Sequence, residues 1–116
     1  MPHDSDVADI TVCIFTDGQG STAKAVPGHA VVKRGQTILW ENLTDHDLRL
    51  AFPDADVIFD NGMGQALRVE AGKSSPAVRV RDDAPRGGHP YMGVCQHRGR
   101  SGMCVEGGSH PVMIIR

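Results

Sequence analysis

The stretch AVVKRGQTILWEN, at positions 30–42, decides the fold class because it holds two short apolar runs separated by a tight turn. The run at 30–33 ends at an Arg-Gly pair, and the run at 37–42 alternates, with Trp40 and Asn42 on the same face. Alternation over roughly four to eight residues is typical of a β-strand, and a glycine between two such runs is typical of a turn. We therefore predict two consecutive strands here.

Six further segments show the same short apolar or alternating pattern, separated by turns that contain Gly or Pro. They are residues 7–15, 48–52, 67–69, 77–80, 91–95 and 112–115. The stretches 17–29, 53–65 and 82–90 are expected to be loops. Short strands at this spacing predict an all-β protein of seven to eight strands, built as a β-sandwich or a small barrel.

Length and composition limit the architecture further. The chain has 116 residues, 40% of them hydrophobic and 22% charged, which is ordinary for a globular protein. We expect one domain over residues 1–116, with a flexible N-terminus at 1–6. No apolar run approaches the roughly 20 residues that span a bilayer, so no membrane span is expected.

The first six residues, MPHDSD, are polar and acidic, unlike the basic and then apolar opening of an export signal. We therefore expect a cytoplasmic protein, or a periplasmic one if a leader has been removed. The five aromatic residues all lie outside the arginine-rich segment 98–100, so nucleic-acid binding is not predicted. The sequence has no Gly-x-Ser-x-Gly, P-loop or His-Glu-x-x-His motif, and we do not predict an enzyme.

Candidate metal ligands gather near the C-terminal end. The chain has three cysteines, an odd number that does not suit a framework of disulfides. We expect Cys13 to be a small buried side chain, whereas Cys95 and Cys104 lie among histidines and methionines at positions 89–113. Thiolate, thioether and imidazole ligands together favour copper or zinc over magnesium or calcium.

At this point the sequence resembles the cupredoxin family of blue-copper proteins. The resemblance covers most of the chain from about residue 30 and rests on five segments. They are VVKRGQTILWEN at 31–42, DHD at 45–47, VEAGKS at 69–74, YMGVC at 91–95 and GM at 102–103. The resemblance implies a single Greek-key β-sandwich.

The same resemblance implies a function. One copper ion would be bound by His46, Cys95 and His97, with Met103 as a weak axial ligand, and would serve one-electron transfer. The arginines at positions 86, 98 and 100 would surround the site with positive charge. This charge would favour a protein redox partner with an acidic surface. The sequence does not predict the oligomeric state.

The ligand loop departs from the family in one place. Plastocyanin-like members have histidine three residues after the cysteine, where this chain has Arg98, and His97 comes one position earlier. A second alignment is open, in which His110 and Met113 form the His-x-x-Met ending of amicyanin-like loops, with Cys104 as a further candidate. The alternative function is a cupredoxin-like scaffold without redox copper, acting as a binding or assembly module or as a carrier of Cu(I) or zinc.

Overall fold

The computed structural model of the chain describes residues 8–16, 23–60, 66–97, 100–103 and 111–116. Of residues 16, 94–97 and 100–103 it describes the backbone alone. Strands dominate these segments, and one short helix, α1 (Ala55–Ile58), interrupts them. Within the described segments no helix has the length and apolar character needed to cross a membrane. The predicted all-β fold class is confirmed.

The first layer of the sandwich is a four-stranded sheet. Across the sheet the order is β2 (Ala23–Val26), β1 (Ile10–Thr16), β4 (Thr37–Asn42) and β7 (Val78–Arg79). β1 is antiparallel to β2 and parallel to β4, with Val12 opposite Trp40. A parallel pair needs a crossover connection. Here the chain crosses into the other layer as β3 (His29–Val32) before it returns as β4.

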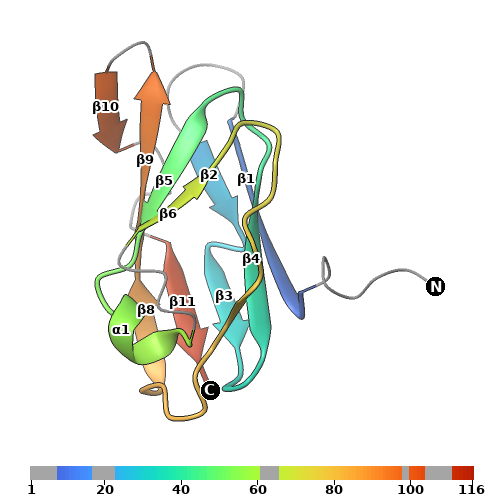
Figure 1. Cartoon of the computed structure of the whole chain (residues 1–116), viewed down its shortest axis with the longest axis vertical. Helices are drawn as coiled ribbons and strands as arrows, with labels where there is room; N and C mark the ends of the chain where they lie inside the picture. Colours follow the sequence, from blue (N-terminus) through green and yellow to red (C-terminus); the bar gives the residue numbers. More distant parts are fainter. Residues whose placement is uncertain (1–7, 17–22, 61–65, 98–99, 104–110) are drawn as a thin grey trace, which may run out of the picture.

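The second layer consists of two short sheets, and two consecutive strands of the chain, one in each sheet, join them (Figure 1). The first has the order β10 (Arg100–Met103), β9 (Met92–His97), β5 (Asp47–Ala51), β6 (Ala66–Val69), and the second β3, β11 (Val112–Ile115), β8 (Gly87–Pro90). Only Tyr91 separates β8 from β9, and its backbone N–H donates to the carbonyl of Pro111 at 3.0 Å. The chain therefore pairs first with β11 and then with β5, which joins the two sheets.

Each predicted strand has a counterpart, but the described residues form eleven strands in all. Of the three additional strands, β2 and β8 fall in segments expected to be loops, and β10 falls where no strand was expected. Each of the three lies at an edge of its sheet. An edge strand has one open side and does not need an apolar pattern. In β8, with the sequence GGHP, only His89 is buried. Hydrophobic periodicity therefore could not reveal β8.

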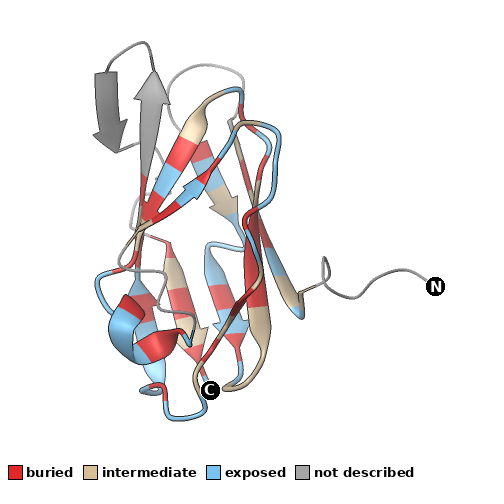
Figure 2. Ribbon diagram, viewed as in Figure 1, coloured by how far each residue is buried: buried red, intermediate tan, exposed pale blue. Residues whose placement is uncertain are grey.

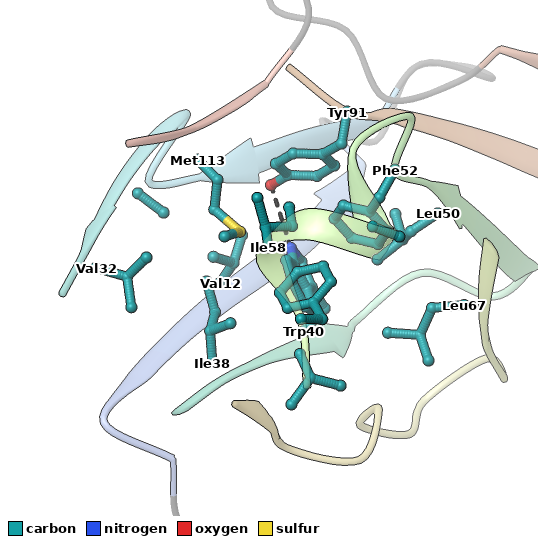
Figure 3. Packing of buried hydrophobic residues seen from close by; sticks show 14 of the residues in the cluster. Val12, Val32, Ile38, Trp40, Leu50, Phe52, Ile58, Leu67, Tyr91 and Met113 are labelled. Carbon is teal, nitrogen blue, oxygen red and sulfur yellow. Dashed lines mark hydrogen bonds between the residues drawn. The ribbon is translucent and has the colours of Figure 1, made fainter. Parts of the chain in front are cut away.

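Aromatic side chains form the centre of the core between the layers. The ring centroid of Trp40 lies 5.0 Å from that of Phe52 and 5.7 Å from that of Tyr91. Phe52 and Tyr91 stack, with 5.1 Å between their centroids. Figure 3 shows these rings meeting the aliphatic side chains of both layers. Offset and edge-to-face ring contacts are favourable beyond the area they bury, and here they fix β4 against the second layer.

Burial alternates along the strands that cover the core, as Figure 2 shows for β3 and β5. This alternation corrects one prediction, because Cys13 is only half-buried. It lies between Val12 and Ile14, whose side chains are fully buried. Successive side chains of a strand point to opposite faces, so Cys13 faces away from the core.

Candidate metal centre

The connection between β4 and β5, at the upper end of the molecule in Figure 1, contains His46. The His46 side chain is 25% exposed, and its Nε2 atom lies 3.2 Å from Oδ1 of Asp45. Asp45 is 90% exposed, and a pair so open to water contributes little to stability. The imidazole of His46 therefore sits where solvent and a metal ion can reach it.

The backbone of His46 is held in place by the side chain of Asn42. The Asn42 amide group donates to the carbonyl of His46 at 2.7 Å and to the carbonyl of Val69 at 3.0 Å. Its Oδ1 accepts from the Thr44 hydroxyl at 2.6 Å and from the Thr44 backbone N–H at 3.0 Å. Asn42 is fully buried, and a buried amide with all these contacts made is rigid. The Thr44 hydroxyl also contacts the His46 carbonyl at 3.0 Å and accepts from its backbone N–H at 3.2 Å, so two side chains fix the turn that carries His46.

The pairing of β5 with β9 brings this turn next to Cys95. Leu48 lies opposite Cys95, and Asp47 lies opposite Gln96. His46 directly precedes Asp47 and His97 directly follows Gln96, so the two histidines flank the end of this pairing. The backbone thus brings His46, Cys95 and His97 into adjacent segments of chain.

Met103 ends β10, where it lies opposite Val94, and its neighbour Gly102 lies opposite Cys95. β10 is therefore the next strand across from Cys95. The side chains of Cys95, His97 and Met103 lie outside the described residues, and so do the whole of Arg98, Cys104 and His110. The set His46, Cys95, His97 and Met103 stays a prediction.

Among the side chains that the structure describes, no group of three or more histidine, cysteine, aspartate or glutamate residues could hold a metal ion. Of the four predicted ligands, His46 is the one whose side chain the structure describes. By residue type, the thiol of Cys95 and the thioether of Met103, on the paired strands β9 and β10, would suit copper together with a histidine. The residues present are compatible with the metal that the family resemblance implies.

Met113, a candidate in the second alignment, belongs to the core. It is fully buried in β11, opposite Ala30 of β3 and His89 of β8. Figure 3 shows its side chain pointing inward beside Val12 and Val32. In this position Met113 contributes to the packing of the core.

Arg86 does not lie near the candidate centre, contrary to the prediction. It directly precedes β8, whereas His97 ends β9, and the two strands follow one another with only Tyr91 between them. β8 lies at the lower end of the molecule in Figure 1 and the end of β9 at the upper end. Sequence proximity to the cysteine segment misled the prediction, because an extended strand carries its two ends far apart.

Sequence reasoning also missed a contact between a buried histidine and an exposed aspartate, His89 and Asp54. His89 is 8% exposed, and its Nδ1 atom lies 2.9 Å from Oδ2 of Asp54 while its Nε2 atom lies 2.8 Å from the carbonyl of Pro85. Both ring nitrogens therefore face oxygen acceptors. No local motif links residues so far apart, and the pair belongs to the lower end of the fold, away from His46.

No protein-family model matches the sequence, and no curated protein matches it. Solved structures do match the fold. A purple cupredoxin from Nitrosopumilus maritimus superposes with a TM-score of 0.56 and 14% identity, over 93% of this chain and 100% of that one. A mutant of amicyanin with Cu(I) gives a TM-score of 0.52 and 18% identity, over 96% of this chain and 87% of that one.

A multicopper oxidase also matches, with a TM-score of 0.52 and 11% identity. This chain covers 45% of the oxidase chain, while 94% of this chain is matched. The likeness at such low identity concerns the fold. These structures and the two-layer topology together show that the chain folds as a cupredoxin-like β-sandwich.

Proposed function

We propose that this protein binds one copper ion through His46, Cys95, His97 and Met103 and uses it to transfer single electrons. The observation that carries the proposal is the β5–β9 register, which sets Cys95 opposite Leu48 and brings the anchored His46 turn to the end of β9. Two matching structures are a cupredoxin and a Cu(I) form of amicyanin, which supports copper as the metal.

In this proposal each residue has a defined task. Cys95 supplies a thiolate, His46 and His97 supply imidazoles, and Met103 supplies a weak thioether ligand. Copper, when bound there, supplies the one-electron chemistry. The Asn42 hydrogen bonds to His46 and Val69 keep the His46 turn in one conformation. A ligand held by the fold rearranges little when the metal changes its charge. The electron partner is a protein with an acidic surface.

A second candidate function is a cupredoxin-like scaffold without redox copper, acting as a binding module or a carrier of Cu(I) or zinc. The contact of His46 Nε2 with Asp45 favours it, because this nitrogen already has a partner at 3.2 Å. Arg98 favours it as well, since a permanently charged guanidinium stands where the family has a histidine.

Titration with Cu(II), followed by visible absorption, tests the proposal. The full chain should develop an intense thiolate-to-copper charge-transfer band, and Cys95→Ser should abolish it. Cys13→Ser is the matched control, because Cys13 lies half-buried on β1 and should leave the band unchanged. A band that persists in Cys95→Ser removes Cys95 from the site. A colourless chain that binds Cu(I) or zinc supports the scaffold.

A further inference from the structure

The outer side of the second layer contains a pocket of about 350 Å³. Its lining includes, among the described residues, Asp47, Leu48, Arg49 and Arg68, from the adjacent strands β5 and β6. A hollow of this size is sufficient for a small molecule. Among the lining side chains that the structure describes, two are guanidinium groups, which sets the chemistry of this part of the pocket.

Arg49 and Arg68 lie directly opposite each other in the β5–β6 ladder. Like charges in directly opposed positions of an antiparallel pair destabilise the sheet. Among the described residues Arg49 makes no ion pair, so nothing in this part of the chain offsets its charge. An arrangement that costs stability and leaves a cation at a pocket suits the binding of an anion.

Asp47 holds one of the two guanidinium groups in place. One carboxylate oxygen accepts from Nη2 of Arg68 at 2.9 Å, and the other accepts from the backbone N–H of Ala71 at 3.0 Å. Asp47 thus orients Arg68, and among the described lining residues two guanidinium groups face one carboxylate.

We infer that this pocket binds a phosphate group, either inorganic phosphate or that of a small monoester. Arginine presents several N–H donors in a rigid fork that matches phosphate oxygens. A tetrahedral oxyanion offers oxygens on several sides and can accept from two guanidinium groups on neighbouring strands. A planar carboxylate is already provided to Arg68 by Asp47. The inference does not depend on the proposed copper site.

Isothermal titration calorimetry of the full chain with inorganic phosphate, at constant ionic strength, tests the inference. We expect saturable binding that Arg49→Gln and Arg68→Gln each weaken roughly tenfold or more, because each removes charge-assisted hydrogen bonds. Arg49→Lys should bind more weakly than the unaltered chain, since it keeps the charge and loses the fork. Arg81→Gln is the matched control, because Arg81 pairs with Asp83 and does not line the pocket.

Glycerol phosphate and acetate, used as separate ligands, identify the chemistry. Tighter binding of glycerol phosphate than of inorganic phosphate assigns the site to a monoester, and the reverse order assigns it to the free ion. Acetate that binds as tightly as phosphate overturns the phosphate assignment. Phosphate binding that survives in Arg49→Gln and Arg68→Gln, or that Arg81→Gln weakens equally, overturns the site. Circular dichroism without ligand should show Arg49→Gln folded and at least as stable, because the variant relieves a like-charge pair.

Discussion

The indole N–H of Trp40 donates to the phenol oxygen of Tyr91 inside the core, with 3.1 Å between Nε1 and Oη. These are the single tryptophan and the single tyrosine of the chain, and both are fully buried. Tyr91 stands where β8 passes into β9, four positions before Cys95. The hydrogen bond, drawn in Figure 3, therefore ties the first layer to the strand that carries the predicted thiolate.

We predict that the protein loses stability between pH 10 and pH 12 through Tyr91. Burial raises the pKa of this phenol from 10.0 to about 12, although the hydrogen bond from Trp40 opposes the shift. The unfolded chain then loses its phenol proton first as the pH rises, so the full stability is present below pH 10. Two pKa units correspond to roughly 3 kcal/mol. Chemical denaturation at several pH values measures the loss.

Tyr91→Phe is the control for this prediction. The variant should show no such phase of alkaline destabilisation, since the chain has no other tyrosine. At neutral pH it should be about 1–3 kcal/mol less stable, because the buried Trp40 N–H loses its acceptor. The phenolate absorbance of the unaltered chain reports Tyr91 alone. An ordinary tyrosine titration midpoint there would contradict the prediction.

The strands that cover the core were predictable because each has an apolar face. Ile38, Trp40 and Asn42 lie on the buried face of β4, as their alternation predicts. The edge strand β8 was not predictable, since backbone pairing holds it and its sequence GGHP has no alternating apolar pattern. β2 does alternate, as AKAV, but its inward residues are alanines, which give a weak signal. Local sequence therefore predicts strands that bury a face of large apolar side chains.

The functional residues also include some that a local motif predicts and some that it does not. The Trp40-x-Asn42 motif pointed to His46, and the structure explains it through the Asn42 hydrogen bond to the His46 carbonyl. The opposition of Arg49 and Arg68 depends on the β5–β6 register, which joins residues 19 positions apart in the chain. Register follows from the whole sandwich and from no short motif.

Asn42→Ala should destabilise the protein by about 2–4 kcal/mol. The substitution leaves the Val69 carbonyl without its side-chain donor and the His46 carbonyl with the Thr44 hydroxyl alone. It also removes the oxygen that accepts from the Thr44 hydroxyl and backbone N–H, in a fully buried position. Urea denaturation with an unchanged m-value measures the effect. Thr44→Ser is the matched control, because it keeps the hydroxyl and should cost less. Equal losses in both variants would show that packing, and not the Asn42 amide, holds the turn.

His89 and Asp54 should show an energetic coupling of about 1 kcal/mol in a double-mutant cycle. The Nδ1–Oδ2 distance of 2.9 Å places them in direct contact, and residues in contact do not contribute additively. The cycle compares His89→Ala, Asp54→Ala and the double variant by thermal or urea unfolding. Additive effects would mean that the pair contributes nothing beyond its separate contacts.

The ranking of two histidines tests the ligand set. If His97 is a ligand, His97→Ala should weaken copper binding far more than His110→Ala, because loss of an imidazole opens the coordination sphere. Competitive metal titrations of both variants measure the two affinities. The opposite order would support the alignment that uses His110, although Met113 lies in the core in this structure.

Arg98→His should strengthen copper binding or sharpen the blue band. Arg98 stands three residues after Cys95, where the plastocyanin-like proteins that the sequence resembles have a histidine. A guanidinium is permanently protonated, cannot ligate copper and repels the cation, whereas an imidazole at this position supplies a nitrogen ligand. The double variant Arg98→His with His97→Ala asks whether the new imidazole replaces the old one, and it should keep most of the affinity that His97→Ala alone loses. If affinity and spectrum stay the same in both backgrounds, the loop after Cys95 does not follow the path of the family. The assignment of His97 would then fall with it, because both rest on the same alignment.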